Sequence, residues 1–333
     1  MIDRVGYKAP LVVGLLGDAA SMVLYAFSKI PLHLALVRVL HGATGALVAP
    51  STMSVMANYS AKERKGRSMS LYGIALASAS LIGYPISGLI TSHLSFNALF
   101  FFGAVVVGTG MLMSLILPRN GRKQAVIDDL PKSNSIQQVR DLLSRKGLIP
   151  SYIAIFAQYF TFGGVVTLLP LHLAKLDMGA FEVGMLLTVF SVMFVLVQFP
   201  GGVVSDRIGR LPPIVIGLLC IIFSLLMLPL LSSFPLLASV TGLYGIGYGL
   251  LFPSISALIT DHTIVHERGL ATGLFHALLT AGVAIGAPVA GWVGDTLGTK
   301  AGILISSVPI AITLVITLIF FKRNLSDTSV MPI

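Results

Sequence analysis

The chain has 333 residues, of which 55% are hydrophobic and only 11% are charged. Soluble domains carry about 25% charged residues, so this composition excludes an ordinary soluble globular protein and an intrinsically disordered one. The mean hydropathy of +0.92 points to the bilayer as solvent. The single cysteine, Cys220, excludes a disulfide framework and a zinc site built from four cysteines.

Ten long apolar runs follow one another along the chain. About 20 mostly apolar residues are needed for a helix to cross about 30 Å of hydrocarbon. A transmembrane β-barrel would show alternating strands of about ten residues, whereas these runs are continuous and longer. We therefore expect an all-α polytopic membrane protein. Its ten predicted transmembrane helices cover residues 9–28, 31–57, 68–91, 96–118, 149–174, 181–204, 213–231, 235–260, 269–294 and 301–321.

The distribution of basic residues predicts how these helices are oriented in the membrane. If the N-terminus lies in the cytoplasm, 18 of the 22 Lys and Arg residues fall in cytoplasmic segments, and only Lys29, Lys175 and Lys300 fall in outer loops. Such an excess is typical of cytoplasmic loops. The pattern predicts a multi-pass protein of the plasma (inner) membrane with both termini cytoplasmic. It also accounts for the net charge of +9 without a nucleic-acid partner.

One long polar stretch, residues 119–148, separates the helices into two groups. We interpret it as a solvated cytoplasmic linker with a short amphipathic helix from Ile136 to Leu148; binding to the anionic inner leaflet is the alternative. The predicted domains are an incomplete four-helix bundle (1–118), the linker (119–148), a six-helix bundle (149–321) and a cytoplasmic tail (322–333).

The two groups of helices repeat one another at an offset of 203 residues, with one pair at 204. Recurring pairs are Asp3-Arg4-Val5-Gly6 with Asp206-Arg207-Ile208-Gly209, Gly83-x-Pro85-x-x-Gly88 with Gly286-x-Pro288-x-x-Gly291, and Glu63-Arg64 with Glu267-Arg268. Because matching features have the same orientation in the membrane, this is a parallel repeat, which is a transporter architecture.

The two groups differ in their number of predicted helices, because four precede the linker and six follow it. The helices within 149–204 precede the second Asp-Arg-x-Gly stretch and have no counterpart before Asp3. We therefore expect a six-plus-six protein whose first two helices are missing from this sequence. A genuine ten-helix protein is the alternative.

Several motifs resemble those of one transporter family. The loop from Gly202 to Arg210 (Gly-Val-Val-Ser-Asp-Arg-Ile-Gly-Arg) resembles the G-x-L-a-D-r-x-G-r-k loop of the major facilitator superfamily, and residues 3–8 are similar to its tail. Arg38-x2-His41-Gly42 resembles the fourth-helix motif, with histidine where glutamine is usual. Gly83-Tyr-Pro85-Ile-Ser-Gly88 resembles the fifth-helix motif of exporters, with one inserted residue and no final glycine. A similar copy is Gly282-x3-Gly286-Ala-Pro288-x2-Gly291.

This resemblance implies a secondary transporter that works by alternating access, closest in motif to drug/proton antiporters. We expect proton-coupled export of small lipophilic or cationic compounds, driven by the proton gradient without a cofactor. A nutrient or metabolite uptake carrier is the alternative within transport, and a non-transporting truncated remnant is the alternative of another class. An enzyme is not expected, since no metal-spaced cluster or nucleophile–base pair stands out. We expect the partners to be a small-molecule substrate and the lipid bilayer, and the protein to be a monomer if the chain is complete.

The loop motif is a candidate gate latch. Asp206 could accept backbone N–H bonds at the next helix start and pair with a basic residue across the bundle. Arg207 and Arg210 could bridge to Glu267 or to neighbouring helix carboxyl ends. A tight turn that carries topology charge is the alternative. The predicted gating residues are Asp3, Arg4, Gly6, Gly202, Asp206, Arg207, Gly209, Arg210, Glu267 and Arg268.

Few ionisable residues are expected at membrane depth, where they are costly. Asp18 lies about 14 Å into its helix, and Arg38 and His41 lie about 10 and 15 Å from the outer end of the next helix. We hypothesise a cluster of these three residues that exchanges partners as a proton binds; a static ion pair is the alternative. Arg38 is favoured over Asp18 because its helix lines the cavity of the resembled fold.

Other candidates are polar or aromatic residues that could contact a substrate, with simple packing as the alternative: Gln158, Tyr159, Tyr244, Tyr248 and His276. Glycine and proline weaken helices and permit bends and close approach. The predicted helix-bend residues are Gly83, Pro85, Gly88, Gly282, Gly286, Pro288 and Gly291.

Overall fold

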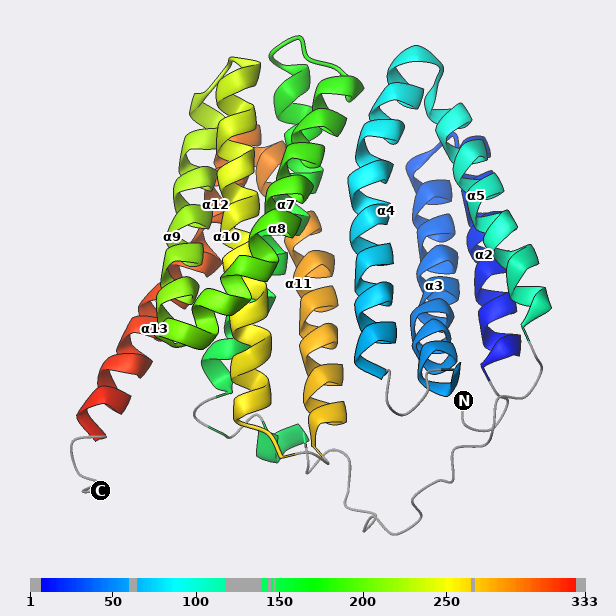
Figure 1. Ribbon diagram of the computed structural model, residues 1–333. Helices are drawn as coiled ribbons and strands as arrows, with labels where there is room; N and C mark the ends of the chain where they lie inside the picture. The colour runs from blue at the N-terminus through cyan, green and yellow to red at the C-terminus, as the bar shows by residue number, and fades with distance from the viewer. Residues whose placement is uncertain are drawn as a thin grey trace. The chain divides into compact units, whose positions relative to one another are not determined.

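The computed structural model describes residues 7–59, 65–117, 139–142, 145, 148–264 and 267–327, and all regular structure in those ranges is helical. The chain divides into two compact units, Met1–Pro131 and Lys132–Ile333. Figure 1 shows the helices of each unit, which we describe separately. The predicted all-α, polytopic class is confirmed.

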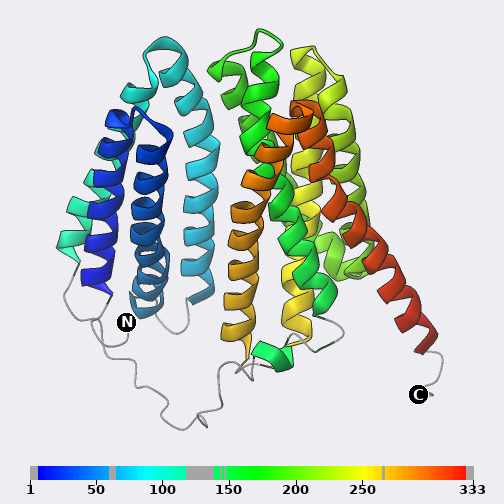
Figure 2. The same ribbon diagram turned by 180° about the vertical axis from the view of Figure 1, so that it is seen from behind.

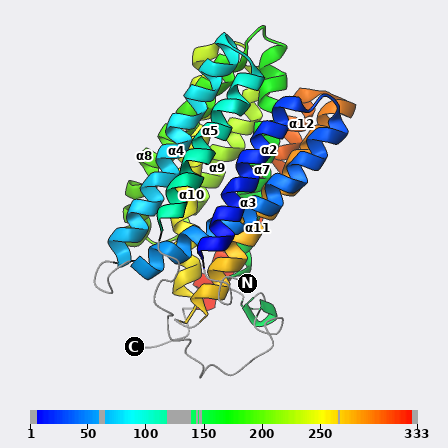
Figure 3. The same cartoon turned by 90° about the vertical axis from the view of Figure 1, so that its right-hand side faces the viewer.

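The N-terminal unit contains the four helices α2 (Lys8–Phe27), α3 (Pro31–Tyr59), α4 (Lys65–His93) and α5 (Phe96–Ile116). Short loops join α2 to α3 and α4 to α5, so these neighbours are antiparallel. α2 packs against both α3 and α5, and Figure 3 shows α2 and α3 side by side. At the start of α5 the hydroxyl of Ser95 accepts a hydrogen bond of 3.0 Å from the backbone N–H of Ala98, which caps the helix.

The C-terminal unit begins with α7 (Ile149–Ala174), α8 (Ala180–Ile208) and α9 (Leu211–Met227), which continues into the 3-10 turn η2 (Leu228–Leu230). It ends with α10 (Phe234–Asp261), α11 (Arg268–Leu297), α12 (Thr299–Ser306) and α13 (Val308–Asp327). α7 packs on α11 and α8 packs on α10 over most of their lengths; Figure 2 shows these helices from behind.

Small residues allow these close helix contacts. A Cβ at Gly163 of α7 would lie 2.7 Å from the carbonyl oxygen of Val283 in α11, and one at Gly282 would lie 2.6 Å from that of Phe156. A Cβ at Gly249 of α10 would lie 2.9 Å from the carbonyl oxygen of Phe194 in α8. Glycine brings these backbones together where hydrocarbon surrounds the bundle and packing drives helix association.

Each of the ten predicted runs coincides with helix. In the part of the chain that the structure describes, nine segments are long and apolar enough to span a membrane. The remaining run, 68–91, lies in the 29-residue helix α4, where most side chains before residue 78 are outside the described set. Run 301–321 is divided between α12 and α13 at Ser307, two residues before Pro309, which has no N–H for a continuous helical ladder.

The expected linker helix from Ile136 to Leu148 lies largely outside the described residues. Residues 139–142 are helical, and Leu142 and Leu148 are buried in the C-terminal unit. We call the end of this unit at which Leu148 lies the linker side.

Candidate functional site

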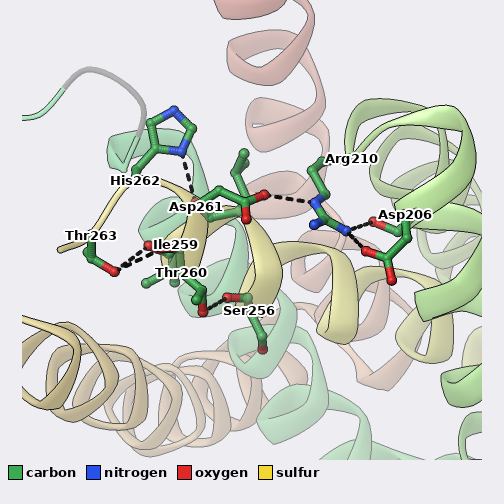
Figure 4. A network of polar contacts seen from close by, with 10 residues as sticks. Asp206, Arg210, Ser256, Ile259, Thr260, Asp261, His262 and Thr263 are labelled. Atoms are coloured by element: carbon green, nitrogen blue, oxygen red, sulfur yellow. Dashed lines mark hydrogen bonds and ion pairs between the residues drawn. The ribbon is translucent and has the colours of Figure 1, made fainter. Parts of the chain in front are cut away.

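A first cluster of charges lies at the linker side of the C-terminal unit (Figure 4). α8 ends at Ile208, and Gly209 with φ of 93° turns the chain into α9. Glycine suits this backbone conformation, in which a Cβ is unfavourable. The turn brings Arg210 back against Asp206, one helical turn earlier, so that the sequence spacing itself builds the first ion pair.

Arg210 joins this turn to the end of α10. Its Nη1 donates to Asp206 Oδ1 and, at 3.3 Å, to Ser205 Oγ. Its Nε donates to Oδ2 of Asp261, the last residue of α10, at 2.9 Å. The hydrogen bonds to Asp206 and Asp261 raise the pKa of the Arg210 guanidinium, so it stays charged. The result is a three-residue clasp between the α8–α9 turn and α10.

A second ion pair ties the linker to the turn between α10 and α11. Arg145 donates from Nη1 to Glu267 Oε2 and from Nη2 to Glu267 Oε1, both at 2.7 Å. Its Nη1 also donates to the carbonyl oxygen of His262 at 3.1 Å. The bond to Glu267 raises the pKa of Arg145. Two parallel charge-assisted bonds hold a guanidinium in one orientation, and the buried Leu142 and Leu148 anchor the chain around it.

These contacts correct the pairing expected from the sequence. The described contacts include no bridge from Arg207 or Arg210 to Glu267, whose two carboxylate oxygens both accept from Arg145. Arg207 is exposed, and Arg210 instead reaches the carboxyl end of α10, the other expected kind of partner. Asp206 was expected to accept backbone N–H bonds at the start of α9. Its described partner is instead the guanidinium of Arg210.

The other gating residues are placed only in part. A Cβ at Gly202 would lie 3.8 Å from Cβ of Pro253, which puts this glycine at the contact of α8 with α10. Asp3, Arg4 and Gly6 lie outside the described residues, as does the side chain of Arg268 at the start of α11. Their predicted role in gating stays a prediction.

The N-terminal unit holds an open pocket of about 480 Å³ on α2, α3 and α5. It is lined by Met22, Tyr25, Leu34, Ala35, Arg38, His41 and Phe100. Arg38 is exposed, and Nδ1 of His41 lies 3.5 Å from the hydroxyl of Tyr25. The walls are therefore mostly apolar and aromatic, with one guanidinium and one imidazole among them.

Asp18 does not join Arg38 and His41. The hydroxyl of Thr44 in α3 donates to Asp18 Oδ1 at 2.5 Å, and the described residues show no ion pair of Asp18 with either Arg38 or His41. Thr44 lies on the same face of α3 as His41, one helical turn further along the helix. At that position its hydroxyl contacts the carboxylate of Asp18. The expected three-residue cluster is therefore absent from the described contacts, although Arg38 and His41 do share a pocket.

A buried polar cluster joins α7 to α10 inside the C-terminal unit. Thr161 Oγ1 lies 2.8 Å from the hydroxyl of Tyr244 and 3.1 Å from that of Tyr248. Thr161, at 2.7 Å, and Tyr248 both donate to the carbonyl oxygen of Gln158. Tyr244 and Tyr248 are 2% and 1% exposed, so both tyrosines are buried within the C-terminal unit in this structure.

Tyr159 and His276 lie differently from each other. The ring of Tyr159 meets that of Tyr248 at a centroid distance of 6.0 Å, at the edge of the buried cluster. His276 is an exposed residue of α11, in edge contact with the ring of Phe275. The structure thus brings Gln158, Tyr159, Tyr244 and Tyr248 together and leaves His276 apart.

The two copies of the helix-bend motif have different surroundings. In α4, a Cβ added at Gly83 would meet no described atom within 4 Å, Pro85 is partly buried and Gly88 is buried. In α11, Gly282 and Gly286 lie directly on the backbone of α7 near Phe160. Pro288 lies inside α11, and a Cβ at Gly291 would be 3.7 Å from Thr167. The α11 copy is thus a packing surface for α7.

Sequence reasoning missed four residues that take part in these contacts: Thr44, Arg145, Thr161 and Asp261. Thr161 follows Gln158 by one helical turn, and Asp261 ends a predicted helix, so both carried a local signal. Nothing in the sequence marked Arg145, because its partner Glu267 is more than a hundred residues away.

Comparisons with known proteins add to this geometry. A sequence profile described as Major Facilitator Superfamily matches residues 1–181 and 151–330. The chain is 24% identical over 303 residues to an uncharacterised MFS-type transporter of Methanocaldococcus jannaschii, and the match covers 89% of this chain and 77% of that protein. It is 25% identical over 150 residues to the quinolone resistance protein NorA of Staphylococcus aureus. That match covers 45% of this chain and 39% of NorA's length.

Proposed function

Because the chain belongs to the major facilitator superfamily and is a membrane transporter rather than an enzyme, we propose that it exports small lipophilic or cationic compounds in exchange for protons. The observation that carries the lipophilic part of this substrate class is the absence of charged side chains from the described interior of the C-terminal unit. Its buried polar side chains are those of Ser, Thr, Gln and His. Burying an unpaired charged group would be costly there, whereas lipophilic compounds need none. The partial similarity to NorA, named for quinolone resistance, supports export.

The proton-carrying group in this proposal is the carboxylate of Asp18. It lies within α2, which is long and apolar enough to span the bilayer, and Thr44 supplies a neutral hydrogen-bond donor. Ionisable groups inside membrane helices are costly and commonly mark ion or proton pathways. His41 and Arg38, in the pocket next to it along α3, are the proposed contacts of the N-terminal unit with the substrate.

The clasp of Asp206, Arg210 and Asp261 and the Arg145–Glu267 pair are proposed to hold the linker side of the C-terminal unit closed. Each network joins two segments that are far apart in the chain, so each must break for its two segments to separate. The excess of basic residues in the loops supports a cytoplasmic location for this side and for both termini, in the plasma (inner) membrane.

Purified protein in liposomes that contain trapped DNA tests the proposal, with ethidium as the fluorescent probe. An acidic lumen should drive ethidium into the liposomes as protons leave, and a protonophore should abolish the accumulation. Accumulation only with an alkaline lumen would indicate uptake together with protons instead. Absence of any gradient-dependent flux of ethidium would reject the proposal of proton-driven export.

A further inference from the structure

The side chain of Gln158 is a buried amide without hydrogen-bond partners in the described part of the chain. It is 0% exposed, and neither its Oε1 nor its Nε2 has a hydrogen-bond partner among the described residues. A primary amide offers two N–H donors and an acceptor oxygen. Leaving these groups unpaired in an apolar interior costs free energy, so a buried amide of this kind needs an explanation.

The neighbouring hydroxyl groups do not satisfy this amide. Thr161 and Tyr248 both donate to the backbone carbonyl of Gln158, and the hydroxyl of Tyr244 lies within 2.8 Å of Thr161 and 3.1 Å of Tyr248. The three hydroxyl groups therefore form a closed set around that carbonyl. The side-chain amide of Gln158 lies outside this set, with its donors and its acceptor both available.

The position of Gln158 on α7 shows what surrounds it. Residues three and four apart share a helix face. On the next turn Thr161 meets the tyrosines of α10, and the ring of Phe162 lies 5.5 Å from that of Phe190 in α8. Gln158 thus lies on the face of α7 that packs against α8 and α10. Aromatic rings lie on this face, with Tyr248 in contact with Tyr159, Phe190 and Phe194.

We propose that the Gln158 amide and these rings form a recognition site for uncharged aromatic compounds that carry a lactam or amide edge. Nε2 would donate to the carbonyl oxygen of the lactam while Oε1 accepts from its N–H, and the rings would contact its aromatic body. A lactam presents one donor and one acceptor side by side, which matches the two unpaired functions of a glutamine amide. No buried residue described in the C-terminal unit is acidic or is a Lys or Arg, so the site favours a neutral ligand.

This inference rests on the proposed function, since the helices close over Gln158 in this structure and the site opens only as the transporter changes conformation. It deepens that function by naming a substrate class for the C-terminal unit. In this site, substrates would be distinguished by the hydrogen-bond donor and acceptor of the Gln158 amide and not by a charged side chain. A site that pairs buried polar groups with a ligand rejects an analogue that lacks one of the partners.

Two fluorescent probes of nearly the same shape test the proposal: 7-amino-4-methyl-2-quinolinone, a lactam, and 7-amino-4-methylcoumarin, in which a ring oxygen replaces the lactam N–H. Binding is measured by equilibrium dialysis against lipid nanodiscs with and without the full chain. We expect the lactam to bind about tenfold more tightly than the lactone, as for one lost hydrogen bond that leaves its buried partner unpaired.

The variant Gln158→Leu keeps a similar volume and removes both hydrogen-bonding functions. It should bind the two probes equally, whereas Gln198→Leu, the same change at the glutamine of α8, should keep the lactam preference. The thermal midpoint of Gln158→Leu should not fall below that of the unchanged chain, because no internal partner is lost. A lower midpoint would show that the amide is bonded within the protein and would overturn the proposal.

Three further outcomes would overturn the proposed site. The unchanged chain could bind the two probes equally, it could bind neither probe, or Gln158→Leu could keep the lactam preference. The test is separate from that of the proposed function. Gradient-driven ethidium flux without lactam preference would leave the export proposal intact and reject this site. A lactam preference without any flux would support the site and reject proton-driven export.

Discussion

Asp18 is the residue whose surroundings most directly suggest a role in coupling. Its carboxylate faces α3 and accepts from Thr44 rather than pairing with Arg38. This contact is a hydrogen bond from a neutral donor and not an ion pair. The sequence supplied the residue and its depth, but the structure replaced its expected partner by a hydroxyl group.

We expect Asp18→Asn to lose accumulation of ethidium driven by an acidic lumen while keeping exchange of ethidium without a gradient. Asparagine can still accept from Thr44, but it has no proton to release at any ordinary pH. The measurement is the ethidium signal in liposomes, compared with that of the unchanged chain under the same gradient. Gradient-driven accumulation that persists in Asp18→Asn would reject the proton relay.

Among the elements, α7 and α11 depend most visibly on glycine. Gly282 and Gly286 of α11 lie on the backbone of α7, whereas Gly273, further toward the start of α11, has no described atom within 4 Å of where a Cβ would lie. Replacing glycine by alanine in α11 would therefore cause a clash with α7 at Gly286 and no clash with a described atom at Gly273. This difference separates the packing role of glycine from its intrinsic cost to a helix.

Gly286→Ala should destabilise the protein, by roughly 1–3 kcal/mol as for overpacked interiors, because the added methyl group meets the carbonyl of Phe160. Gly273→Ala should be neutral or stabilising by up to about 1 kcal/mol, since alanine is the better helix former. Thermal midpoints in detergent measure both variants. If the two midpoints shift equally, the tight α7–α11 contact is not present in solution.

At the scale of the whole molecule, the linker is the segment whose placement matters most. Its last residues are packed into the C-terminal unit through Leu142 and Leu148 and are oriented by Arg145 on Glu267. The connection between the two units therefore ends in a docked segment. Arg145 bonds to the α10–α11 turn, so movement of that turn would also move the docked end of the linker. The linker is therefore coupled to the proposed closing of the linker side of the C-terminal unit.

Reversing the charges tests this docking. Arg145→Glu and Glu267→Arg each place like charges together and should speed chymotrypsin cleavage after Leu142, which is 1% exposed in the docked state. The double variant should restore protection, because the pair is rebuilt with opposite polarity. Slow cleavage in both single variants, or fast cleavage in the double variant, would show that this ion pair does not hold the linker.

Part of the candidate site was accessible from the sequence and part was not. The glycine turn at Gly209 follows from the loop motif, whereas the pairing of Asp206 with Arg210 was not among the expected contacts, although the two residues are only four apart. The pairing of Arg145 with Glu267 could not be predicted, because an ion pair across more than a hundred residues leaves no periodic trace. The same holds for Thr44 and Asp18, whose contact depends on the rotation of α3 against α2.

The sequence by itself determined that this chain is an all-α membrane transporter and where its apolar segments lie. Hydrocarbon forces every spanning segment to satisfy its own backbone, so length and apolarity are enough to predict helices. Only the tertiary structure decided which side chains meet. Within the C-terminal unit it buried Tyr244 and Tyr248 around a backbone carbonyl, left Gln158 unpaired and exposed His276. Helix rotation and packing set these contacts, and apolar composition does not specify either.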